Sequence, residues 1–173
     1  MRMSVLLFIT IFCVFICDAQ FKMQRVANLQ AVQERAMVLY HDPDYVKDPQ
    51  AFTGRLKRGY PYRTNFTATT LHPWANNVTF SLVLSHKRTG NDPIMAVRVC
   101  DALSHSWMAE FIWTYFHTKT CPYPPRTYSA VNLELPPKNY PFPVPKGDIQ
   151  IFAYFSLTES KHILVKYSLK IHV

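Results

Sequence analysis

Seven histidines and one Ser-His-Ser triplet are the residues with which this sequence could do chemistry. No two histidines have the His-Glu-x-x-His spacing of a zinc protease, and no Cys-x-x-Cys pair follows residue 17. Ser104-His105-Ser106 offers a nucleophile and a base, but no Gly-x-Ser-x-Gly elbow surrounds it and no acid is placed to orient the histidine. The sequence therefore predicts a protein that is not an enzyme, with no cofactor and no metal site.

The N-terminus is typical of a secretory signal peptide. Arg2 precedes an apolar run of 13 residues, 5–17, and the small residue Ala19 follows. A membrane-spanning helix needs roughly 20 apolar residues, so we favour cleavage after Ala19 over a membrane anchor. No later run approaches that length, and we expect an extracellular protein without a transmembrane segment once residues 1–19 are removed.

Three further features agree with secretion. Asn65-Phe66-Thr67 and Asn77-Val78-Thr79 are N-glycosylation acceptor patterns. Cys100 and Cys121 are the only cysteines beyond the signal peptide, and in an oxidising compartment an isolated pair is expected to form a disulfide. The net charge of +8 favours contact with acidic surfaces or anionic head groups. Basic runs are too short, in a secreted chain, to predict a nucleic-acid partner.

The residues before Asn65 are harder to interpret. Apolar residues at helical spacing favour one helix over residues 21–40, and breakers such as Pro43, Pro49 and Gly54 favour a turn-rich segment over residues 41–61. Within it, Arg55-Leu56-Lys57-Arg58 resembles a site for secretory-pathway proteases, although a solvated basic loop is the interpretation we favour. We therefore divide the chain into a signal peptide (1–19), an N-terminal extension (20–64) and a domain (65–173).

From Asn65 onward the pattern has period two. Strands are predicted over residues 78–85, 94–99, 128–135, 148–157 and 161–173, with β-hairpins joining the first two and the last two. The strand at 148–157 has apolar residues on both faces, so it is either central and covered on both sides or borders an apolar cavity. Eight prolines between Pro122 and Pro145 favour an extended connection. The expected fold is mainly β, a two-sheet antiparallel β-sandwich.

One amphipathic helix interrupts these strands. Its apolar stripe recurs at three and four residues and consists of Leu103, Trp107, Met108, Phe111, Ile112, Tyr115 and Phe116. The stripe either plugs the core or covers a binding site. A straight helix over residues 101–116 would be about 24 Å long, too long for the five remaining residues to bring Cys121 back to Cys100. The helix must therefore be shorter or broken, and Ser106 is a candidate cap for a second segment.

The order of these parts resembles a known family. They are similar to the parts of an insect family of small secreted proteins. The parts that carry the resemblance are the signal peptide, the Val-x-Val-Cys strand end at Cys100, the aromatic helix, Cys121-Pro122, the run "PFPVPKGDIQI" around Pro145-Lys146-Gly147-Asp148 and the closing hairpin. That family includes the CheA-type chemosensory proteins and is related to the ML-type, ganglioside-activator-like lipid-recognition fold. The resemblance covers residues 65–173.

The resemblance implies an immunoglobulin-like, ML-type sandwich whose sheets part at one end to hold a lipid or hydrophobic semiochemical, without catalysis, in taste or pheromone detection. A chemoreceptor or ion channel on sensory neurons is the protein partner that it implies. Under this hypothesis the helix closes the mouth of the cavity, and Lys87 and Arg88 meet an anionic head group. The expected ligand-binding residues are Phe80, Leu82, Trp107, Met108, Phe111, Tyr115, Phe155 and Tyr167. The alternative is a secreted ligand or accessory subunit of a receptor or channel, with a solid core and no cavity.

Overall fold

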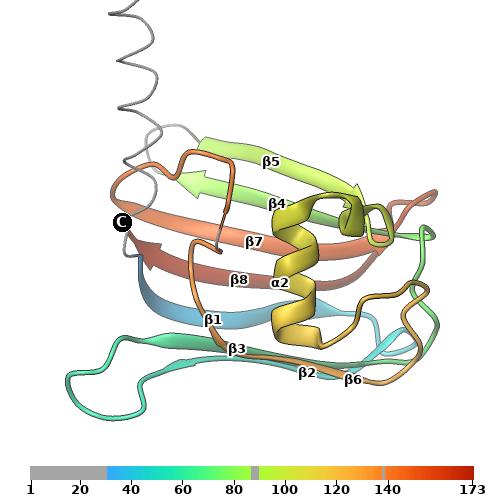
Figure 1. The fold of residues 1–173 in the computed structure, drawn as a ribbon, viewed down its shortest axis with the longest axis horizontal. Helices are drawn as coiled ribbons and strands as arrows, with labels where there is room; N and C mark the ends of the chain where they lie inside the picture. The colour runs from blue at the N-terminus through green and yellow to red at the C-terminus, as the bar shows by residue number, and fades with distance from the viewer. Residues whose placement is uncertain (1–30, 87–89, 138) are drawn as a thin grey trace, which may run out of the picture. The chain divides into compact units, whose positions relative to one another are not determined.

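The computed structural model describes residues 31–86, 90–137 and 139–173, and Ala31–Val173 form one compact unit. The predicted signal peptide lies outside these residues. Within them the chain is mainly β, with two antiparallel sheets and one inserted α-helix (Figure 1). The predicted fold class, a two-sheet β-sandwich with an inserted helix, is confirmed.

The larger sheet has five strands in the order β1-β8-β7-β4-β5, and every neighbouring pair is antiparallel. In that order the strands are Val32–His41, Ile163–His172, Asp148–Leu157, Val78–His86 and Gly90–Arg98. The pairs β4–β5 and β7–β8 confirm the two predicted hairpins.

The register of this sheet decides which side chains share its inner face. Phe80 is opposite Phe155, Leu82 is opposite Ala153, and Ala153 is in turn opposite Tyr167. Directly paired residues point to the same face of a sheet, and side chains along one strand alternate between faces. These five side chains, from three adjacent strands, therefore face the same side.

The smaller sheet has three strands in the order β2-β3-β6, which are Val46–Gly54, Arg63–Thr70 and Thr127–Leu133. Its inner face packs against that of the larger sheet: Val46 is fully buried, and Phe66 packs edge-on against Tyr167 with ring centroids 5.1 Å apart. Buried Gln33 on β1 also joins the sheets, because its Nε2 donates to the Leu133 carbonyl on β6 at 2.8 Å.

Two predictions for the N-terminal extension were wrong. The predicted helix over residues 21–40 is strand β1 in its described part, and the turn-rich segment over 41–61 contains strand β2. Because β1 pairs with β8 and β2 with β3, the sandwich includes residues on both sides of the boundary predicted at Asn65. Residues 20–30 lie outside the described residues.

The basic sequence Arg55-Leu56-Lys57-Arg58 lies in the loop between β2 and β3. Leu56 is 88% exposed, and Lys57 lies over the ring of Tyr60 with its Nζ 4.8 Å from the centroid. A solvated loop is thus what the structure describes here, and cleavage after Arg58 stays a prediction.

The helical segment is broken, as the spacing of the cysteines required. A 3-10 helix, η2 (Asp101–Ser104), ends at an extended His105, and helix α2 (Ser106–Phe116) begins at the next residue. His105 takes the N-cap position that was predicted for Ser106. The break lets the chain return, so that Cys100 and Cys121 form the predicted disulfide with 5.6 Å between their Cα atoms.

Candidate ligand-binding cavity

A cavity of about 300 Å³ lies between the two sheets and helix α2. Figure 1 shows α2 standing beside the sandwich and crossing from the five-stranded sheet to the three-stranded sheet. The larger sheet lines the cavity with Phe80, Leu82, Leu84, Ile151, Ala153, Phe155, Val165, Tyr167, Leu169 and Ile171; the smaller sheet contributes Phe66, Ala68, Ala130 and Leu133.

The burial of the central strands reflects this cavity. Leu82, Ala153 and Phe155 lie on the inner face of strands that have neighbours on both sides, yet each is only partly buried. In a solid sandwich such positions are normally filled by the facing sheet. Strand β7 therefore borders a cavity, which is one of the two alternatives that the sequence left for residues 148–157.

Helix α2 closes one side of this space. Met108 and Ile112 are buried, and they line the cavity with Trp107, Phe111 and Phe116. Residues three and four positions apart share one face of a helix, so this stripe turns toward the cavity. The opposite face carries Trp113, which is 47% exposed and lies under the Lys119 ammonium group.

Tyr115 does not line the cavity. Its hydroxyl accepts a hydrogen bond at 3.0 Å from the backbone N–H of Glu134, just beyond β6. Arg126 reinforces the same junction, because its guanidinium donates to the Phe116 carbonyl at 3.2 Å. Tyr115 therefore holds the end of α2 beside the smaller sheet. This corrects its placement among the expected cavity residues.

The proline-rich segment after β6 forms a further wall, which was predicted only as an extended connection. It lines the cavity with Leu135, Pro136, Pro137, Tyr140 and Val144. The ring of Tyr140 packs edge-on against Trp107 of α2, with the centroids 5.2 Å apart. This contact joins the helix to the segment at the side of the cavity.

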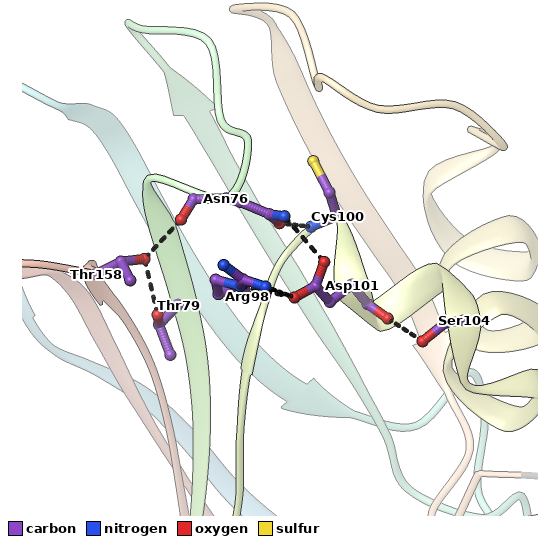
Figure 2. Close-up of polar contacts among 7 residues, drawn as sticks. All are labelled: Asn76, Thr79, Arg98, Cys100, Asp101, Ser104 and Thr158. Atoms are coloured by element: carbon purple, nitrogen blue, oxygen red, sulfur yellow. Dashed lines mark hydrogen bonds and ion pairs between the residues drawn. The ribbon is translucent and has the colours of Figure 1, made fainter.

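A polar cluster anchors the start of the helical segment (Figure 2). The Asn76 side chain accepts from the Cys100 N–H at 3.2 Å and donates to the Asp101 carboxylate at 2.9 Å. Arg98 donates to the same carboxylate at 2.6 Å, while the Thr158 hydroxyl donates to the Asn76 carbonyl at 2.9 Å. The hydrogen bond from Asn76, followed by that from Arg98, lowers the pKa of Asp101. The carboxylate thus stays charged and holds η2 against the turn that precedes β4.

The far end of the helical segment returns to the same region. Cys121 is bonded to Cys100, and Tyr123 exchanges two backbone hydrogen bonds with Trp74, of 2.8 and 2.9 Å. Both ends of the segment that carries α2 are therefore attached beside residues 74–77.

The described residues of the cavity wall carry no charge. Each of them is apolar, aromatic, serine or threonine. Burial raises the pKa of Tyr140 to about 12 and also raises the pKa of Tyr167, so both phenols remain protonated at neutral pH. Such a wall can exclude water and hold apolar surface, but it supplies no general base and no charged nucleophile.

The residues considered at first for chemistry lie elsewhere. Ser104, His105 and Ser106 are exposed at the break between η2 and α2, and the Ser104 hydroxyl donates to the Asp101 carbonyl at 2.7 Å. Among the described residues, no group of three or more His, Cys, Asp or Glu side chains is placed to hold a metal ion.

Seven of the eight expected ligand-binding residues border the cavity, which are Phe80, Leu82, Trp107, Met108, Phe111, Phe155 and Tyr167. Whether they contact a ligand stays a prediction, as does glycosylation at half-buried Asn65 and exposed Asn77. Lys87 and Arg88, expected near a head group, lie outside the described residues.

Sequence reasoning missed three parts of the wall. Ile112 and Phe116 belong to the predicted helical stripe and could have been included by their spacing. Phe66 lies in β3, where the flanking threonines and Ala68 gave no strong alternation. The proline-rich residues have no periodicity, so no signal marked them as part of a binding surface.

The chain matches no protein-family model and no curated protein. Among solved structures it is similar to the crystal structure of chicken MD-1 complexed with lipid IVa, with a TM-score of 0.34 and 8% identity over 80% of this chain and 96% of that chain. A likeness this distant carries no argument about the ligand, and the resemblance to the CheA-type family stays a prediction. No helix in the described part of the chain is long and apolar enough to span a membrane.

Proposed function

We propose that this protein is a secreted, non-enzymatic binding protein that holds a lipid or another hydrophobic small molecule between its two sheets. The observation that carries this proposal is the uncharged cavity of about 300 Å³, closed on one side by α2. Pockets for small molecules span roughly 300 to 1,000 Å³, so this one suits a single aliphatic chain better than a lipid with several chains.

Burial of the chain would supply the binding energy. Each methylene removed from water contributes about 0.8 kcal/mol, so a chain of about a dozen methylenes gains on the order of 10 kcal/mol before the costs of ordering. Micromolar to nanomolar affinity needs about 8 to 12 kcal/mol. Hydrophobic burial alone therefore comes close to the required range, and no charged group is needed.

We place the protein in the extracellular space, in the detection of tastes or pheromones, with a receptor or channel on sensory neurons as its downstream partner. The signal-like N-terminus, the two glycosylation patterns and the disulfide support secretion. The chemosensory role rests on the sequence resemblance. The solid-core alternative is disfavoured, because the core contains a cavity.

Titration with an uncharged fluorescent anilinonaphthalene dye tests the cavity directly. Ala153 lines the cavity on central strand β7, so Ala153→Phe should fill the space and lower dye affinity at least about tenfold. Ala96 is exposed on β5, outside the lining, and Ala96→Phe is the matched control. Equal affinity in all three proteins would place the dye elsewhere and contradict the proposal.

A further inference from the structure

Tyr167 is only 8% exposed and lines the cavity, and among the described residues its hydroxyl has no hydrogen-bond partner, although it is not one of the fully enclosed unpaired atoms. Tyr167 lies on the inner face of β8, opposite Ala153 of β7, and lines the cavity. The great majority of polar groups inside proteins have a hydrogen-bond partner in the protein or in ordered water. The missing partner is a reason to look for one in the cavity.

The other hydroxyl groups in the wall are largely occupied. The Tyr128 hydroxyl donates to the Pro124 carbonyl at 2.8 Å, and Thr67 is bonded to Ser129 at 3.1 Å. The Tyr140 hydroxyl has no hydrogen-bond partner among the described residues, but Tyr140 is only half-buried, so water can reach it. Tyr167 therefore differs from Tyr128 by its unpaired hydroxyl and from Tyr140 by its greater burial, and it shares the unpaired hydroxyl with Tyr123.

Unpaired donors accumulate around Tyr167. Trp74 and Tyr123 belong to the same packed cluster, line the same cavity, and have a buried indole N–H and a buried hydroxyl without partners. An indole offers only a donor, and a phenol offers one donor with its oxygen. Three donors at this end of the cavity thus lack a partner among the described residues.

We propose that the ligand of the cavity is an uncharged aliphatic molecule with an oxygen acceptor, such as an alcohol, ketone or ester, to which the Tyr167 hydroxyl donates a hydrogen bond. The inference rests on the proposed function and specifies its ligand class. An oxygen at this position would accept from the unpaired Tyr167 hydroxyl, while the rest of the molecule contacts the apolar wall.

A carboxylate fits this position poorly. Among the described residues no arginine, lysine or histidine lines the cavity, so an ionised acid would lose its hydration and gain no opposite charge from them. An alkane would enter without that cost, but it would leave the Tyr167 hydroxyl unpaired. The wall therefore favours the neutral oxygenated compound over both the hydrocarbon and the acid of equal length.

Competition with the anilinonaphthalene dye can compare three ligands of equal chain length: an alkane, a methyl ketone and a carboxylic acid, at neutral pH. Tyr167→Phe is the test variant. Tyr128→Phe is the matched control, because Tyr128 also lines the cavity but its hydroxyl is already bonded to a carbonyl. Thermal unfolding and alkane affinity verify that both variants keep the fold and the cavity.

We expect the wild type to bind the ketone about 3- to 10-fold more tightly than the alkane, the range of one neutral hydrogen bond, and the acid most weakly. Tyr167→Phe should abolish the preference for the ketone, and Tyr128→Phe should preserve it. A preference that survives in Tyr167→Phe, or tightest binding by the acid, would overturn this inference and leave the proposed function standing. Failure of all three ligands and the dye to bind the wild type would overturn both.

Discussion

Single side chains decide how well the cavity is closed. Trp107 lines the cavity from α2 and also packs edge-on against Tyr140 of the proline-rich wall. Trp113, six residues further along the same helix, is 47% exposed on the outer face. The two indoles therefore have the same chemistry and opposite surroundings. Comparing their substitutions separates a role in the cavity from a general contribution of tryptophan to the fold.

Trp107→Ala should lower the affinity for an apolar ligand at least about tenfold, because it removes wall surface and opens the contact with Tyr140. Since Trp107 is half-buried, the free energy of unfolding should fall by about 2 kcal/mol, less than for a fully buried tryptophan. Dye titration and chemical denaturation measure the two effects. Trp113→Ala is the control and should leave affinity within about twofold; ligand retention in a folded Trp107→Ala protein would contradict the role of this residue.

The buried phenols predict how stability depends on alkaline pH. Burial raises the pKa of Tyr140 to about 12, whereas an unfolded tyrosine titrates near 10. The protonated phenol is the form that the folded state favours, so its contribution is fully present below pH of about 10 and is lost as the pH rises toward about 12. Tyr140→Phe should reduce this loss. Unfolding midpoints between pH of about 9 and 12 that decline equally in both proteins would contradict the assignment.

The residue pattern predicted the inner face of the larger sheet because its strands alternate regularly. Period two put Phe80 and Leu82 on one face of their strand and Phe155 on one face of its own, the resemblance implied that all three face a cavity, and all three line it. Tyr115 was expected at the cavity because helical spacing identifies the residues of the apolar stripe. The spacing does not show which of these residues lie beyond the edge of the cavity. Its hydroxyl found a backbone partner at Glu134, a long-range contact that spacing does not encode.

At the scale of elements, the segment with η2 and α2 is fixed at both ends. The disulfide joins residues 21 positions apart, and the polar cluster around Asn76 holds the start of the segment. The helix itself is only 11 residues long, and an isolated helix of that length is marginal in water. Its position beside the cavity therefore depends on these anchors and on the packing of its apolar face.

Replacing both cysteines, Cys100→Ser with Cys121→Ser, should lower the free energy of unfolding by roughly 3 kcal/mol, the chain-entropy value for a loop of this size. Because the disulfide lies outside the cavity wall, ligand affinity should fall less than in Ala153→Phe. Denaturation with and without reductant checks the stability, and the double variant should be insensitive to reductant. Equal stability of the oxidised wild type and the variant would contradict a stabilising disulfide.

Elements were predicted well where the apolar period was undisturbed, as in β4, β7 and β8. The helix expected over residues 21–40 failed for a physical reason. Strand β1 has register irregularities between Gln33 and Arg35 and between Val38 and Tyr40. The helical spacing relied on Val32, Ala36 and Leu39, but Val32 and Leu39 are exposed. Each extra residue breaks the alternation, so the residues of β1 that face the core are Gln33, Ala36 and Val38.

Strand β2 was missed for a related reason. Proline lacks a backbone donor, so Pro49 predicted a turn. In the structure Pro49 lies at a register shift between Lys47 and Gln50, in an edge strand that leaves one side of its backbone without a partner strand. An edge position and a bulge are the two settings in which a sheet accepts proline, and neither can be recognised before the pairing of the strands is known.

At the scale of the whole described unit, the cavity follows from two sheets that are incompletely filled between β3, β6 and the larger sheet. Sequence patterns predicted which faces turn inward but not the distance between the sheets. For that reason the pattern at 148–157 could not decide between a central strand covered on both sides and a strand that borders a cavity. The proline-rich wall completes the enclosure, and it was not expected to contribute.

Native mass spectrometry of the secreted protein, produced in insect cells and deglycosylated, tests the central claim most directly. The account predicts added mass that is lost on denaturation and corresponds to an uncharged aliphatic molecule, with Ala153→Phe showing less of it than Ala96→Phe. A bare mass for the wild type that stays unchanged after incubation with alkanes, ketones, esters and fatty acids would contradict a binding function for the cavity.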